Sequence, residues 1–141
     1  MTEERGEFLS FIFQVRDAKR EHSKALARFA ELDAACKRIT PNWSADGGGG
    51  GDSQRLWAMR ADESARVDAA LAAVDRAREN VLAVTTQVDG RLSQRVLRLR
   101  YAECLPWPRI CRILQGYSDR HIYRVHRKAI AEAEKIWRNT R

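Results

Sequence analysis

Apolar side chains recur along residues 11–39 at alternating spacings of four and three, and this repeat constrains the fold more than any other feature. The stripe consists of Phe11, Val15, Ala18, His22, Ala25, Phe29, Leu32, Cys36 and Ile39, with His22 as its one polar member. A repeat averaging about 3.5 residues keeps these side chains on one face of an α-helix. We therefore predict one long helix from Phe11 to Ile39. It should end at Thr40 and Pro41, because the residue before a proline disfavours helical geometry.

Five consecutive glycines, Gly47 to Gly51, follow this stripe. Ordering such a run costs much conformational entropy, so we expect a flexible Gly-rich loop over residues 42–54. A second stripe follows it, made of Val67, Ala70, Val74, Ala77, Val81, Val84 and Val88. Two stripes on either side of a loop predict an antiparallel pair of helices, so residues 1–88 are expected to form a coiled-coil-like helical hairpin arm. The second stripe is rich in alanine and thin, which favours a further partner, either the C-terminal module or a second subunit.

Positive charge is concentrated in the last third of the chain. Residues 88–141 contain 13 Lys and Arg against 5 Asp and Glu, whereas residues 1–87 contain 13 against 14. The formal net charge of +7 therefore arises entirely in the C-terminal part. Clustered cations are typical of a nucleic-acid-binding module, because they release counterions from the phosphates. A merely solvated basic face is the alternative interpretation.

Several classes of protein are disfavoured by the sequence. It lacks the roughly 18 consecutive apolar residues of a membrane span, and its acidic start, MTEERGEF, does not resemble a signal peptide. The three cysteines do not form a disulfide pattern, so we expect a cytoplasmic protein without membrane association.

Metal binding and catalysis are disfavoured as well. Cys104, Cys111, His121 and His126 are zinc-ligand types, but residues five apart on a helix differ by about 140°, so the two histidines would not converge on one ion. The sequence has no GxSxG, HExxH or GxxxxGK[ST] motif. We expect a non-enzyme without catalytic residues, metal or cofactor.

Residues 89–141 alternate helical patterns with turn signals. Asp89 is a candidate N-cap for a helix over residues 90–103. Leu105-Pro106-Trp107-Pro108 should end that helix and begin a short one over residues 109–115, because proline is tolerated in a first helical turn. Gly116 supplies a turn, and Ser118 is a candidate N-cap for a last helix over residues 119–138. Ile122, Val125, Ala129 and Ile136 form the expected core stripe of that helix. This order of elements is typical of a helix-turn-helix DNA-binding domain.

Three segments of this region carry a family resemblance. Val96-Leu97-Arg98-Leu99-Arg100-Tyr101, Leu105-Pro106-Trp107-Pro108-Arg109-Ile110 and residues 117–130, YSDRHIYRVHRKAI, are together similar to region 4 of bacterial sigma factors. The chain especially resembles the small phage late transcriptional regulators of the ArpU and RinA-like type. The resemblance implies a sigma region 4-like helix-turn-helix behind an N-terminal helical hairpin, and it covers about residues 89–138.

The resemblance also implies roles for individual residues. Base edges would be read by Arg120, His121 and Arg124. The phosphate backbone would be contacted by Tyr123, Arg127, Lys128 and Arg109, and Ser118 would cap the recognition helix. The chemistry agrees, because a guanidinium can donate two parallel hydrogen bonds to guanine, whereas phosphate contacts add affinity without sequence information.

The sequence therefore predicts an all-α, sequence-specific transcriptional regulator of phage or prophage type, an activator acting in the cytoplasm of a bacterial host cell. Its expected partners are double-stranded DNA, RNA polymerase by resemblance, and a second copy of the chain through the arm. Two alternatives stay open. One is a DNA-packaging protein similar to a small terminase subunit, and the other is a helical adaptor whose basic face binds an acidic protein instead of DNA.

Overall fold

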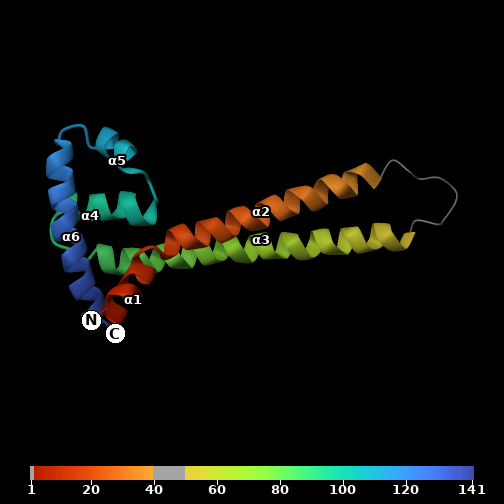
Figure 1. Cartoon of the computed structure of the whole chain (residues 1–141), viewed down its shortest axis with the longest axis horizontal. Helices are drawn as coiled ribbons and strands as arrows, with labels where there is room; N and C mark the ends of the chain where they lie inside the picture. The colour runs from red at the N-terminus through yellow and green to blue at the C-terminus, as the bar shows by residue number, and fades with distance from the viewer. Residues whose placement is uncertain (1, 40–49) are drawn as a thin grey trace. The chain divides into compact units, whose positions relative to one another are not determined.

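The computed structural model describes residues 2–39 and 50–141, and every regular element within them is helical (Figure 1). The elements are α1 (Thr2–Ile12), α2 (Gln14–Ile39), α3 (Gly50–Thr85), α4 (Arg91–Leu97), the π-helical turn η2 (Arg98–Ala102), α5 (Trp107–Ile113) and α6 (Asp119–Asn139). The predicted all-α class is confirmed. None of the helices formed by these residues is both long enough and apolar enough to cross a bilayer.

The packing divides the chain into two compact units. Unit 1 combines Met1–Asp17 with Asp75–Arg141, and unit 2 is Ala18–Val74. This division differs from the predicted domains, 1–88 and 89–141, because both ends of the N-terminal region pack with the C-terminal helices. The functional division of the chain into an arm and a DNA-binding domain stays a prediction.

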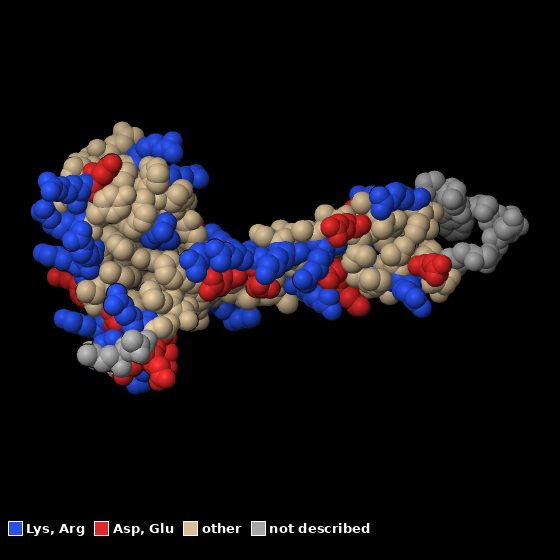
Figure 2. Space-filling model, in the orientation of Figure 1, with Lys and Arg blue, Asp and Glu red and all other residues tan. Residues whose placement is uncertain are grey.

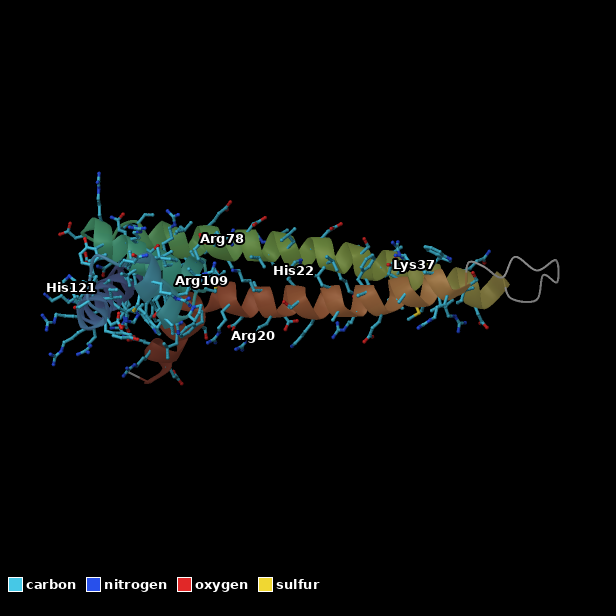
Figure 3. All side chains as sticks on the ribbon, turned by 90° about the horizontal axis from the view of Figure 1, so that it is seen from above. Arg20, His22, Lys37, Arg78, Arg109 and His121 are labelled. Atoms are coloured by element: carbon cyan, nitrogen blue, oxygen red, sulfur yellow. The ribbon has the colours of Figure 1, made fainter. Side chains whose placement is uncertain are left out.

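In unit 2, α2 and α3 lie side by side and run in opposite directions (Figures 1 and 3). Arg60 on α3 ties them together, because its Nε donates to Asp33 Oδ1 on α2 at 2.8 Å and its guanidinium lies 4.9 Å from the Phe29 ring centroid. Ala25 and Cys36 of the first stripe are buried between the helices. The apolar repeat thus points its small residues inward, as its spacing predicted.

The predicted start of the first helix is wrong. Helix begins at Thr2 and is interrupted at Phe13, which separates α1 from α2. Packing within unit 1 accounts for the extra element, because Phe8 and Ile12 are buried and the Phe8 and Phe11 rings lie 5.5 and 5.8 Å from the Trp137 ring of α6. Contacts with a helix more than a hundred residues away could not be seen in the local repeat.

The predicted loop over residues 42–54 is wrong for residues 50–54, which form the first turns of α3. Residues 42–49 of that loop lie outside the described residues, as do Thr40 and Pro41. Asp52 stands in the first turn of α3, where a carboxylate interacts favourably with the helix dipole, and no breaker follows it. Within the described residues, α3 thus includes the last two glycines of the run, Gly50 and Gly51.

The connection from α3 to α4 also departs from the prediction. Gly90, not Asp89, occupies the N-cap position of α4, and its φ of 94° lies in the region that glycine adopts most easily. The predicted helix over 90–103 is instead α4 followed by η2, which the Glu103 amide closes by donating to the Arg98 carbonyl at 2.9 Å. Cys104 ends it with a left-handed φ of 57°. Arg78 of α3 holds this end in place by donating to the Ala102 carbonyl at 3.5 Å.

The C-terminal helices share one hydrophobic core in unit 1. Val96 of α4, Ile110 and Leu114 around α5, and Ile122 of α6 are all at most 2% exposed and pack together. Each large aliphatic side chain buried in this way contributes about 1.5–3 kcal/mol. This core fixes how α5 and α6 present their outer faces.

Candidate nucleic-acid interface

α5 begins at the two prolines, as the sequence indicated. Pro106 is its N-cap residue and Pro108 stands in its first turn, where a missing amide hydrogen costs no helical bond. The helix starts at Trp107, two residues before the predicted start at Arg109, and ends at Ile113. Ile110 faces the core, and Arg109 is exposed on the outer side.

The turn between α5 and α6 is closed by backbone bonds and a side-chain cap. The Tyr117 amide donates to the Leu114 carbonyl at 3.1 Å, and the Ser118 hydroxyl accepts from the His121 amide at 3.2 Å. Ser118 has extended backbone angles of −71° and 152°, the usual geometry of an N-cap residue. The predicted cap is confirmed, and it sets the position at which α6 begins.

α6 has two opposite faces. Its inner face is buried at Ile122, Ala129 and Ala133, which are at most 1% exposed. Four exposed cations lie on the outer side of its first half, and we refer to them as the basic face: Arg120, Arg124, Arg127 and Lys128. At about 100° per residue, the three arginines fall within an arc of about 60°. Figure 2 shows blue side chains gathered along the α6 side of unit 1.

The cations along α6 differ in whether they form ion pairs. No carboxylate within residues 2–39 and 50–141 forms an ion pair with any cation of the basic face. In the second half, Arg138 Nη2 pairs with Glu134 Oε1 at 2.7 Å, while Lys135 has no ion pair with a described residue. The first half of α6 therefore presents positive charge that the described protein does not neutralise.

Two aromatic pairs flank the basic face. His121 is exposed at the start of α6, and its ring stacks on Tyr117, with centroids 5.6 Å apart and planes 25° apart. Tyr123 is 42% exposed, and its ring lies 5.1 Å from Trp107 of α5. Sequence reasoning missed the contact of Tyr117, because Tyr117 lies in the turn before α6, where helical spacing gives no indication of which side chains meet. Tyr123 is thus anchored at its ring while part of it stays accessible.

His126 is a further residue that sequence reasoning considered only as a metal ligand and set aside. It shares a hydrogen bond of 2.7 Å between its Nε2 and the Tyr101 hydroxyl, and its ring meets Trp107 edge-on at 4.7 Å. Burial, and then the charges of Arg100 and Arg127, lower the pKa of this imidazole. His126 therefore acts as an uncharged link between α6 and the elements that precede it.

Arg109 lies on α5 and not on α6, so the predicted site residues come from two helices. It borders an open surface together with Arg112 and Gln115, which were not predicted (Arg109 and His121 are labelled in Figure 3). Arg112 follows Arg109 by three residues, a spacing that places both on one side of a helix. The residues predicted to read bases and those predicted to contact phosphates are all exposed, and six of these seven residues lie on α6.

The described side chains favour an anion-binding surface. The free cations, the stacked aromatic rings and the capped helix start are the groups that contact bases and phosphates in DNA-binding proteins. Among the described residues no group of three or more His, Cys, Asp and Glu side chains could hold a metal ion. Comparison with protein-family models, with curated proteins and with solved structures finds no match to this chain, so the assignment of a function rests on the residues themselves.

Proposed function

We propose that this protein is a sequence-specific double-stranded DNA-binding regulator of transcription. In this proposal α5, the turn 114–118 and α6 act as a helix-turn-helix of the sigma region 4 type, with α6 in the major groove. Arg120, His121 and Arg124 read bases, while Tyr123, Arg127, Lys128 and Arg109 contact phosphates. The protein performs no chemistry and acts by recruitment.

One observation carries the proposal: the four clustered cations of the basic face have no ion-pair partner among the described residues, whereas Arg138 near the end of α6 is paired. An α-helix fits the major groove of B-DNA, and helix-turn-helix proteins insert the N-terminal part of the recognition helix. A solvated structural helix more often intersperses carboxylates with its cations. The distribution along α6 matches the requirements of DNA insertion.

The remaining parts of the proposal concern partners. The antiparallel pair of α2 and α3 would be the hairpin arm, which joins a second copy or contacts the transcription machinery. RNA polymerase enters only through the sigma-like sequence segments. Phage or prophage origin, action in a bacterial cytoplasm and activation instead of repression rest on the same resemblance.

The test is to select sheared DNA from the source genome with the purified protein at about 0.15 M salt and to sequence the bound fragments. We expect enrichment of a promoter-proximal site, and loss of it in the Arg120→Ala/Arg124→Ala variant. Replacing a bidentate arginine costs about 1–3 kcal/mol of discrimination. Arg76→Ala/Arg138→Ala is the matched control, because it removes two exposed arginines that lie outside the basic face.

Each other outcome has a definite meaning. Enrichment near packaging genes, together with a ring of about eight or more subunits by light scattering, would favour a packaging protein. Absence of any enrichment would refute sequence-specific binding and leave the adaptor as the better interpretation. Equal losses in Arg120→Ala/Arg124→Ala and in Arg76→Ala/Arg138→Ala would show that overall charge, and not the basic face, determines binding.

A further inference from the structure

A second basic surface in unit 1 lies away from the basic face of α6. It is a hollow of about 400 Å³ lined by residues from the end of α3, from α4 and from the start of η2. We refer to it as the arginine groove. Six of the residues that line it define it here: Leu82, Thr85, Arg91, Arg95, Arg98 and Leu99. The DNA-binding proposal does not use any of them.

The groove combines an apolar floor with a charged rim. Leu82 and Leu99 are half-buried, while the three arginines are exposed. An apolar centre surrounded by charged groups is the usual composition of a protein–protein interface. A phosphate backbone gains nothing from exposed leucine side chains, because its contacts are with cations and hydrogen-bond donors. The groove therefore suits a protein segment better than a nucleic acid.

The charge of the rim defines the partner. No carboxylate in the described part of the chain forms an ion pair with Arg91, Arg95 or Arg98. Their spacings of four and three residues place them along one side of the continuous helical turns of α4 and the start of η2, over a length of about 10 Å. Two or three carboxylates separated by a helical turn could each be bound by one guanidinium, which forms strong charge-assisted bonds with carboxylates.

A buried hydroxyl, that of Thr85, lies beside the groove. Thr85 is 1% exposed and lines the groove, and its Oγ1 has no hydrogen-bond partner among the described residues. A buried polar group without a partner is unfavourable.

Leu99 of the groove packs against the core that positions α6, but the three arginines of the rim do not belong to that core. Val96 of α4 packs with Ile122 of α6, whereas the exposed arginines lie on the opposite side of the helical turns. Both surfaces could therefore be occupied together. We infer that the arginine groove is a docking surface for an acidic, amphipathic segment of a partner protein.

The test uses a defined probe and charge-matched variants. The probe is a labelled synthetic helical peptide of about 15 residues, with leucines at helical spacing and Asp and Glu between them. Fluorescence anisotropy with the full-length protein at about 0.15 M salt should give a Kd of about 10–100 μM, typical of a small transient interface. A peptide with Asn and Gln in place of Asp and Glu should bind at least tenfold more weakly.

The decisive comparison is between two double variants of equal net charge. Arg95→Gln/Arg98→Gln should weaken binding of the acidic peptide at least tenfold, whereas Arg76→Gln/Arg138→Gln should leave it within about twofold of the wild type. Thermal unfolding of both variants checks that they are folded, which is expected because all four side chains are exposed. Failure of the acidic peptide to bind, or equal losses in the two variants, would overturn the proposal.

DNA binding by the same variants separates this proposal from the proposed function. Arg95→Gln/Arg98→Gln should retain the DNA affinity of the control variant. If it instead lost as much DNA affinity as Arg120→Ala/Arg124→Ala, the groove arginines would belong to the DNA interface and the docking proposal would be refuted. If neither the wild type nor the variants bind DNA, but the acidic peptide binds as expected, the proposed function fails while the docking surface stands.

Discussion

At the scale of single residues, His126 connects protonation to stability. Its Nε2 lies 2.7 Å from the Tyr101 hydroxyl, and burial is the largest cause that lowers its pKa from the ordinary value of 6.5. Above that value the imidazole is neutral in both the folded and the unfolded chain. As the pH falls through 6.5, the unfolded chain binds a proton that the folded chain does not, so the free energy of unfolding decreases.

Replacing His126 should therefore flatten the pH dependence of stability. We expect the Tm of His126→Gln to decrease less between pH 7.5 and pH 5.5 than that of the wild type, whatever its value at neutral pH. Differential scanning calorimetry at both pH values measures the two decreases. His121→Gln, at an exposed position of the same helix, is the control and should keep the wild-type decrease. A His126→Gln protein as sensitive to pH as the wild type would contradict this role.

The N-cap of α6 is a residue with an effect on a whole element. The Ser118 hydroxyl accepts from the His121 amide, one of the donors that a helix start leaves without an internal partner. Ser118→Ala should lower the free energy of unfolding by about 1 kcal/mol, while Ser118→Asn should stay within a few tenths of the wild type. Urea denaturation with an unchanged m value measures both. If Ser118→Ala were as stable as the wild type, the Ser118 side chain would not contribute to the stability of the protein.

At the scale of elements, the sequence identified what local chemistry determines. Ser118 capped α6 as predicted, the prolines started α5, and Val74, Val81 and Val88 of the second stripe are buried. These features follow from spacing and from the intrinsic preferences of serine, proline and valine.

Elements that depend on distant contacts were not predictable in the same way. α1 is separated from α2 without a proline or glycine at Phe13, and its aromatic residues pack on Trp137. The π-helical turn η2 lies just before Cys104, whose φ of 57° is in the left-handed region that cysteine rarely adopts, and no local pattern of the sequence indicates either feature. Of the candidate site, the exposed cations could be predicted, but the contacts of Tyr117, Arg112 and His126 required the packed structure.

At the scale of the whole molecule, the uneven charge of the sequence makes DNA binding sensitive to salt. With a balance of +8 in residues 88–141 and −1 in residues 1–87, attraction to DNA should act through unit 1, where the C-terminal helices lie. Each phosphate that the protein neutralises contributes about 0.9 to the slope of log K against log salt concentration. The slope therefore counts phosphate contacts, which affinity at a single salt concentration does not.

Lys128→Gln should reduce that slope by about 0.9 and weaken binding to all sequences alike, because this proposed contact is to the backbone. Arg124→Gln should instead reduce the preference for the selected site over unrelated DNA. The matched control is Arg138→Gln, which removes the same charge from α6 but starts from a paired arginine, so its slope should equal that of the wild type. Titrations between about 0.05 and 0.2 M salt give these slopes. Equal slopes for Lys128→Gln and Arg138→Gln would mean that Lys128 contributes only to the long-range field, and the phosphate contact proposed for it would be refuted.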